Sequence, residues 1–158
     1  FLFSGTLAEN LRMGQKDASE DQLWKALRIA QAEDFVRQLP QGLNAPVAQG
    51  GTNFSGGQRQ RLAIARALVK EADIFIFDDS FSALDGRTDA ALRQALRAQL
   101  TRPAKLIIAQ RISTIRDADQ ILVLDQGRLA GCGTHEQLMQ SCPAYREIAA
   151  SQSQRKEA

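Results

Sequence analysis

Three short apolar runs in the second half of the chain restrict the possible folds more than any other feature of the sequence. They lie at Ile74–Phe77, Leu106–Ala109 and Ile121–Leu124. Each run is rich in β-branched or large apolar residues and is too short for a core helix, so each predicts a strand. Because the hydrophobicity is nearly continuous, we expect strands that are covered on both faces.

A helical stretch at Thr88–Leu100, with apolar residues at helical spacing, separates the first two predicted strands. A strand, a helix and a strand of this length predict a parallel crossover unit. After the third strand, Asp125-Gln126-Gly127 predicts a tight turn into a short edge strand near Leu129. The middle and end of the chain therefore predict half of an α/β sheet.

The first part of the chain carries helical signals and gives no strand signal before residue 70. Ser19 and Gln22 have capping-box spacing, which predicts the start of an amphipathic helix. A second helix is expected at Asp34–Leu39, and the glycine-containing segment Gln41–Asn53 predicts a loop. We therefore expect a helical region at residues 1–70, half of an α/β sheet at residues 71–150 and a polar tail at residues 151–158.

Charge and composition argue against several classes of protein. The 20 basic and 18 acidic residues leave a net charge of +2, too small for binding nucleic acid or a membrane surface by bulk electrostatics. Two separated cysteines and one histidine argue against a structural zinc site and favour a reducing, cytosolic compartment. No apolar run approaches the roughly 18–20 residues that span a bilayer. The chain begins with Phe1 rather than Met, which suggests a segment of a longer protein.

Two local patterns favour phosphate and metal binding, although each also has a structural explanation. Ser55 and Gln58 have capping-box spacing around two glycines, so this helix start presents free N–H groups and a positive dipole that suit a phosphate. The alternative is an ordinary helix cap. Asp78 and Asp79 end the first apolar strand, where carboxylates of α/β proteins can hold magnesium. The alternative there is a solvated strand end.

Taken together, these patterns follow the order and spacing of a known family. The stretches that carry the similarity are Phe1–Leu11, Phe54–Leu68, Ile74–Ser80, Ser82–Asp85, Ile107–Ile115 and Ile121–Leu138. Over nearly its whole length the chain resembles the ABC ATPases. This resemblance implies an α/β fold of the P-loop NTPase, ABC type, which is partial here. It consists of a helical subdomain and the C-terminal half of the parallel core sheet.

The resemblance assigns the helix start to the family's signature. Ser55, Gly56, Gly57 and Gln58 would form it and would contact the γ-phosphate of an ATP molecule held by the opposite subunit of a dimer. The same resemblance makes Asp78 the Walker B carboxylate, which reaches Mg²⁺ through water.

Three further positions follow from the resemblance, and two of them depart from the family pattern. Asp85 would be the D-loop aspartate at the dimer interface. Asp79 stands where the family has the glutamate that orients attacking water, and its side chain is shorter by roughly 1 Å, a misplacement that can cost about a hundredfold in rate. Gln110 stands at the switch histidine and cannot carry a positive charge. Both departures suggest a site that binds nucleotide and hydrolyses it poorly.

The motif G-x-x-x-x-G-K-[ST], which would hold the phosphates of ATP, does not occur in the sequence. We therefore expect this segment by itself to bind ATP weakly or not at all. It should also lack the strands that would cover one side of its sheet.

The similarity to exporters favours the nucleotide-binding domain of a membrane exporter at the cytoplasmic face of the cell membrane. Its transmembrane domain would lie upstream on the same polypeptide. A second ABC half-transporter would complete the dimer; the two departures favour a heterodimer, and a homodimer stays open. Two alternatives stay open. One is a soluble ABC ATPase of the DNA-repair or chromosome type, and the other is a non-catalytic regulatory module. His135 lies within a capping-box pattern, Thr134–Gln137, and we expect a structural role for it.

Overall fold

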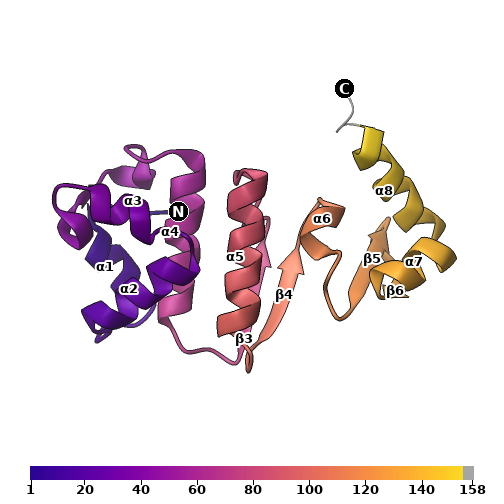
Figure 1. The fold of residues 1–158 in the computed structure, drawn as a ribbon, viewed down its shortest axis with the longest axis horizontal. Coiled ribbons are helices and arrows are strands. Elements are labelled where there is room, and N and C mark those ends of the chain that lie inside the picture. Colours follow the sequence, from indigo (N-terminus) through magenta and orange to yellow (C-terminus); the bar gives the residue numbers. More distant parts are fainter. Residues whose placement is uncertain (155–158) are drawn as a thin grey trace. The chain divides into compact units, whose positions relative to one another are not determined.

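The computed structural model of the chain describes residues 1–154. The chain divides into two compact units, Phe1–Leu106 and Ile107–Ala158. In the colours of Figure 1, the first unit runs from indigo to salmon and the second from orange to yellow.

The first unit begins with short helices and very short strands and continues with longer elements. Its elements are β1 (Gly5–Thr6), α1 (Leu7–Arg12), α2 (Glu20–Ile29), α3 (Glu33–Gln38), the 3₁₀ turns η1 (Gly42–Asn44) and η2 (Gln49–Gly51), β2 (Pro46–Val47), α4 (Gly56–Val69), β3 (Ile74–Asp78), α5 (Gly86–Gln99) and β4 (Ala104–Ile108). Strand β4 crosses the division between the units.

The core of the first unit forms where α4 packs against α1 and α2 (Figure 1). Leu23 and Leu27 of α2 are fully buried, and Leu62 of α4 is 1% exposed. The predicted capping box at the start of α2 is confirmed, because the Gln22 N–H donates to the Ser19 hydroxyl oxygen at 3.3 Å and the Ser19 N–H donates to Oε1 of Gln22 at 2.8 Å. Burial of these apolar faces supplies most of the stability of helices this short.

The expectation that no strand precedes residue 70 is wrong. Strands β1 and β2 pair antiparallel, with Gly5 opposite Val47 and Thr6 opposite Pro46. Each strand has only two residues, so neither can show the alternation that identifies a strand in a sequence. The pairing joins segments that are far apart along the chain, and tertiary contact therefore decides it.

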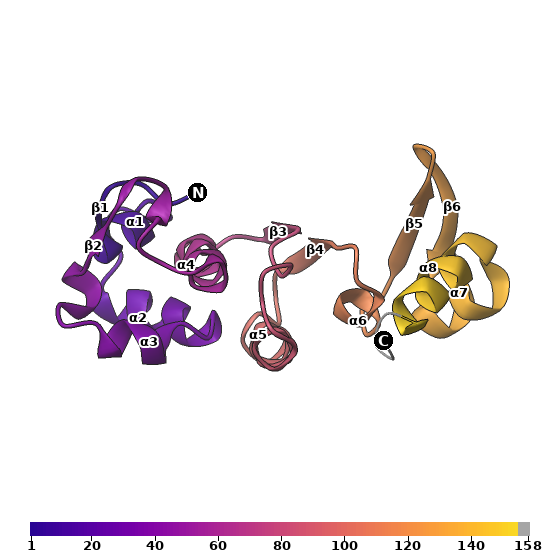
Figure 2. The ribbon, with the colours of Figure 1, turned by 90° about the horizontal axis from the view of Figure 1, so that it is seen from above.

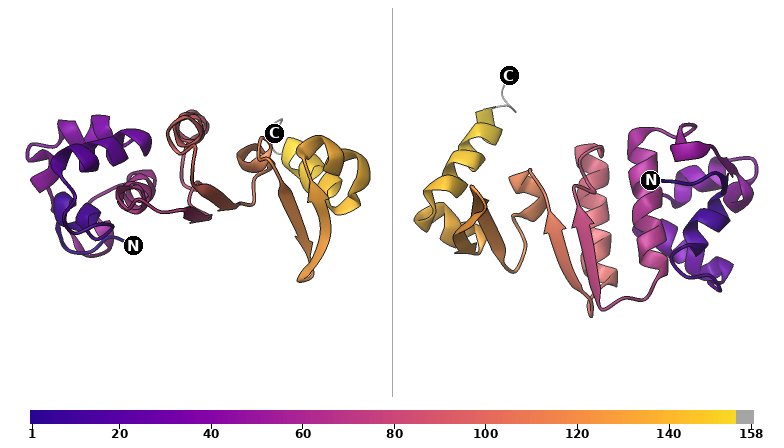
Figure 3. Two further views of the ribbon diagram at one scale, coloured as in Figure 1. Left: turned by 90° about the horizontal axis from the view of Figure 1, so that it is seen from below. Right: turned by 180° about the vertical axis from the view of Figure 1, so that it is seen from behind.

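Strands β3 and β4 form a two-stranded sheet whose arrows point the same way in Figure 3. Phe75 and Phe77 of β3 are buried, whereas Ile74 and Ile76 are 63% and 65% exposed. Figure 2 shows α5 on one side of this pair, so only one face is covered. The predicted strand is therefore present, but the expectation of burial on both faces is wrong for this chain.

The second unit consists of α6 (Ile112–Ile115), the hairpin of β5 (Ile121–Asp125) and β6 (Arg128–Gly133), α7 (His135–Ser141) and α8 (Pro143–Gln154). Figure 2 shows α7 and α8 beside the hairpin, where Val123, Leu138 and Tyr145 share a buried cluster.

The predicted turn between β5 and β6 is confirmed. Gln126 and Gly127 connect the antiparallel strands with φ values of 46° and 75°, as a two-residue hairpin with both residues in the left-handed region requires. The strands of the described residues pair as separate two-stranded sheets, β1–β2, β3–β4 and β5–β6.

Helix α8 continues to Gln154 and so enters the segment that we expected to be a polar tail, of which residues 155–158 lie outside the described residues. The division between compact units falls after Leu106, and α5 packs against α2 within the first unit. Within residues 1–154, every helix is too short or too polar to cross a lipid bilayer.

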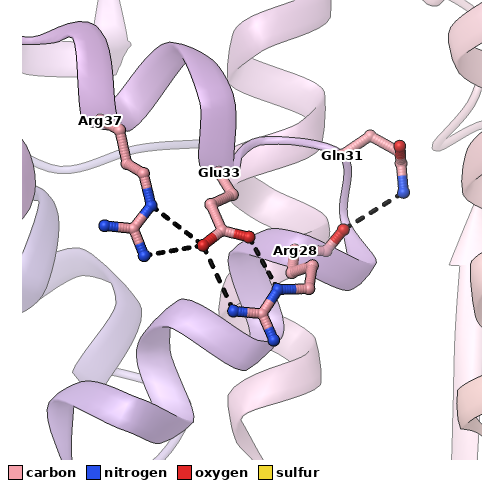
Figure 4. A network of polar contacts seen from close by, with 4 residues as sticks. All are labelled: Arg28, Gln31, Glu33 and Arg37. Atoms are coloured by element: carbon pink, nitrogen blue, oxygen red, sulfur yellow. Dashed lines mark hydrogen bonds and ion pairs between the residues drawn. The ribbon is translucent and has the colours of Figure 1, made fainter.

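A charged network fixes the connection between α2 and α3 (Figure 4). Arg28 donates from Nε to Oε2 of Glu33 at 2.8 Å, and Arg37 donates from a terminal nitrogen to Oε1 of Glu33 at the same distance. Arg37 also lies 4.2 Å from the centre of the Trp24 ring. The hydrogen bonds from Arg28 and Arg37 lower the pKa of Glu33 from its ordinary 4.5 to about 2.

We predict that Glu33→Gln lowers the free energy of unfolding at pH 7 by about 1 kcal/mol or less, because both arginines are largely exposed. A lowered folded-state pKa stabilises the fold fully above about pH 4.5, and this contribution is lost as the pH falls toward 2. Urea denaturation at pH 7, 4 and 2.5 should show the difference between variant and wild type shrinking. Glu20→Gln, at the start of α2, is the control. An equal effect of both substitutions would contradict the network.

Candidate functional site

The first turn of α4 has the cap that its sequence predicts. The Gln58 N–H donates to the Ser55 hydroxyl oxygen at 3.2 Å, and the Ser55 N–H donates to Oε1 of Gln58 at 2.9 Å. Gly56 and Gly57 occupy the first helical positions, whose N–H groups have no acceptor inside a helix. These two N–H groups and the positive end of the helix dipole can bind an anion.

The loop after β3 lies directly against this turn. A Cβ atom placed on Gly57 would be 3.1 Å from the backbone oxygen of Ala83, which is tighter than ordinary contact. Glycine at this position therefore allows the loop to approach the helix start. Phe81 and Leu84 of the same loop are buried.

The two carboxylates at the end of β3 are exposed, and the backbone fixes them differently. The Ser80 hydroxyl donates to the backbone oxygen of Asp78, the last residue of β3, at 3.2 Å. Asp79 has a φ of 45°, in the left-handed region. Aspartate and asparagine tolerate this conformation better than longer side chains do, because the short polar group can bond locally.

The carboxylates fit only a partial role in magnesium binding. Residues 1–154 contain no group of three or more histidine, cysteine, aspartate or glutamate residues that could hold a metal ion. A single exposed carboxylate at a strand end, such as Asp78, suits contact with Mg²⁺ through water, since this ion keeps several waters and takes phosphate oxygens.

Asp85 caps the next helix. Its Oδ1 accepts the Thr88 N–H at 2.9 Å, and its Oδ2 accepts the Thr88 hydroxyl at 2.7 Å. These bonds, the backbone bond first, lower the pKa of Asp85 below its ordinary value. Asp85 thus has a clear structural role at the start of α5, in addition to the interface role that we predicted for it.

Two residues of α4 that were not predicted as site residues, Gln60 and Arg61, join this helix to neighbouring segments. The Arg61 guanidinium donates to the backbone oxygen of Gln31 at 2.5 Å and lies 4.8 Å from the centre of the Phe35 ring. Burial lowers the pKa of Arg61, and the nearby Asp85 carboxylate opposes this shift. Gln60 contacts the loop after β3 with both atoms of its amide. The available signal was the polar run Gln58–Arg61 in a helix whose later residues pack into the core.

The structure therefore brings together most of the predicted site residues in the first unit. The first turn of α4, Ser55–Gln58, is called the signature turn below. Gln60 and Gly57 join it to the loop between Asp79 and Asp85. Gln110, by contrast, belongs to the second unit.

The second unit anchors the backbone around Gln110 and leaves its side chain exposed. The Gln152 side chain donates to the backbone oxygen of Gln110 at 2.6 Å and accepts the Ile112 N–H at 2.9 Å. His135 is paired with Tyr145, with 2.9 Å between Nδ1 and the hydroxyl oxygen. The capping box at Thr134 is also present, so the structural role predicted for His135 is confirmed.

Comparison with solved structures supports the fold. Over 96% of the chain, the structure matches a bacterial Atm1-family ABC exporter solved with ATP bound, with a TM-score of 0.92 and 43% sequence identity. The matched region is 27% of that exporter chain. The chain thus has a partial ABC-type NTPase fold.

Curated relatives show the same similarity. An uncharacterized ABC transporter ATP-binding protein of Mycobacterium tuberculosis is 51% identical over 156 residues, which is 97% of this chain and 26% of that protein. An ATP-dependent lipid A-core flippase of Albidiferax ferrireducens is 45% identical over 148 residues, 93% of this chain and 26% of that protein. The chain therefore spans about a quarter of the length of these relatives. A family model described as ABC transporter matches residues 2–82, slightly more than half of the chain, and the chain belongs to this family of ATP-binding proteins.

Proposed function

We propose that the chain is the C-terminal part of the nucleotide-binding domain of an ABC exporter, which couples ATP binding and hydrolysis to transport. The observation that carries the proposal is the capped signature turn held against the loop that follows the strand-end carboxylates. The relatives support it, because they include an ATP-dependent lipid A-core flippase and an ABC exporter solved with ATP bound.

The signature turn agrees with the family pattern, whereas the strand end and residue 110 depart from it. The signature turn keeps its serine, both glycines and its capping box, and its first N–H groups suit the γ-phosphate of ATP. The strand end carries Asp79 in place of glutamate, and Gln110 replaces the switch histidine. In our proposal this chain's signature completes a competent site on a partner, while its own site mainly binds nucleotide.

ATP and Mg²⁺ are the cofactors of this proposal. Mg²⁺ neutralises phosphate charge when bound. In this chain, Asp78 would hold one of its waters, and the N–H groups of Gly56 and Gly57 would bind the γ-phosphate of the partner's ATP. Asp79 would accept a hydrogen bond from water less effectively than glutamate, because its carboxylate lies nearer to the backbone.

Two partners follow from the proposal. One is a second ABC half-transporter, with a different sequence if this chain's own site is weak. The other is a transmembrane domain on the longer polypeptide. An exporter of this kind works at the cytoplasmic face of the cell membrane.

ATPase activity of the full-length protein without its partner tests the proposal. We predict low activity, and we expect the double reversal Asp79→Glu and Gln110→His to raise it at least about 10-fold, since a well-placed general base generally contributes about 10²–10⁴-fold. The control is the same pair of changes at exposed positions, Asp119→Glu and Gln120→His, which should have no effect.

Two outcomes would contradict parts of the proposal. Equal and full activity of the wild type and the double reversal would remove the weak-site argument. No activity in the reversal, with or without the partner, would favour the non-catalytic regulatory module. Asp79 and Gln110, which replace the glutamate and histidine of the family pattern, are the observation that supports the regulatory module as a second candidate function.

A further inference from the structure

Gln60 lies in the second turn of α4 and binds the loop after β3 through its whole amide group. Nε2 donates to the backbone oxygen of Asp79 at 3.3 Å and to the Ser82 hydroxyl oxygen at 3.1 Å. Oε1 accepts the Ala83 N–H at 2.9 Å. One side chain thus holds both ends of a five-residue segment, residues 79–83.

This segment needs external support at Asp79. The left-handed conformation of Asp79, with a φ of 45°, is unfavourable for a residue other than glycine and persists when its surroundings hold it. The Ser82 hydroxyl also donates to the Asp79 backbone oxygen, at 3.0 Å. Gln60 and Ser82 therefore hold the same carbonyl group. This group is bonded to the Cα atom that carries the Asp79 side chain, so holding it also positions that side chain.

The same loop touches the signature turn. The Ala83 backbone oxygen approaches Gly57 so closely that a Cβ atom there would lie 3.1 Å from it, so glycine leaves room for the loop at the helix start. Gln60 is three residues after Gly57 on the same helix, and it holds the Ala83 N–H. Gln60 therefore fixes Ala83 to α4 by a hydrogen bond, beside the point where the loop approaches the signature turn.

We propose that Gln60 is a positioning residue that locks the Asp79–Ala83 loop to the signature helix, so that the two nucleotide-contacting parts of this chain move as one. This inference rests on the proposed function. Through Gln60, a change at the strand end that faces this chain's own nucleotide alters the signature turn that faces the partner's nucleotide. Gln60 itself touches neither nucleotide.

The test uses the full-length protein assembled with its partner and compares Gln60→Met with wild type. Methionine has a similar length but can make none of the three hydrogen bonds. We expect kcat for ATP hydrolysis to fall about 10–100-fold, as a displacement near 1 Å does, while KM for ATP changes less than about 2-fold. Gln22→Met is the matched control, since it removes a glutamine that bonds to the backbone at the start of α2. It should leave kcat unchanged.

Hydrogen exchange gives a readout that loss of stability alone would not produce. In Gln60→Met the Ala83 amide should exchange at least about 10-fold faster, because it loses its acceptor, whereas the core of α4 should stay protected. Gln60→Glu keeps the acceptor for Ala83 and loses the donors, so we expect slow exchange at Ala83 and a kcat between those of Gln60→Met and wild type.

The outcomes separate this inference from the proposed function. If Ser55→Arg abolishes ATPase activity but Gln60→Met leaves kcat at the wild-type level, the inference is overturned and the proposed function stands. An equal fall in kcat for Gln60→Met and Gln22→Met also overturns it. If Ser55→Arg has no effect on ATPase activity, the proposed function fails, and the coupling role of Gln60 fails with it.

Discussion

Replacing Ser55 by arginine in the full-length protein should lower the ATPase activity of the assembled transporter at least about 100-fold. Arginine removes the hydroxyl group and places a long side chain at the point where Gly56 and Gly57 present their N–H groups. Loss of one positioned donor to a developing charge generally costs about 10²–10³-fold in kcat. Steady-state ATPase assays of the purified assembly measure this effect.

The control for Ser55→Arg must separate catalysis from helix capping. Ser19 caps α2 with the same reciprocal bonds to a glutamine three residues later, so Ser19→Arg loses an equivalent cap, worth about 0.5–2 kcal/mol. We expect similar losses of stability for the two variants and a loss of ATPase activity for Ser55→Arg alone. Similar activity of both variants would show that the signature turn of this chain does not contact nucleotide.

Leu62→Ala should have the largest effect on stability, because Leu62 is 1% exposed in the helix that packs against both α1 and α2. Removing a buried leucine side chain typically costs about 2–5 kcal/mol, from lost burial and from the cavity that remains. Met13→Ala is the control, since Met13 is 55% exposed and should cost less than about 0.5 kcal/mol. Urea denaturation measures both, and equal midpoints would contradict this description of the core.

The sequence predicted the elements whose local pattern is strong. The capping boxes at Ser19, Ser55 and Thr134 and the turn at Gln126-Gly127 are present, because a cap or a two-residue turn depends on a few neighbouring residues. The β1–β2 pair was not predicted, and the expectation that β3 is covered on both faces was wrong. The first depends on contact between distant segments and the second on what covers a strand, and neither is encoded in a short window of sequence.

The site was predicted as motifs and not as a network. Motif order placed Asp78 and Ser55 on a strand end and a helix start, where the structure has them. The bonds from Gln60 to residues 19, 22 and 23 positions further along could not be predicted, because glutamine has no spacing rule that links it to a distant loop. The cap that Asp85 forms with Thr88 was local and could have been predicted from the spacing.

The backbone of Asp79 has a consequence for how this sequence can change. A conformation with φ at 45° favours aspartate over glutamate, so a mutation to glutamate gains catalytic reach but costs folding energy in the same step. Most proteins have little stability to spare, and such a mutation is removed unless its gain in rate is selected immediately. The backbone at this position therefore favours aspartate independently of any effect on catalysis.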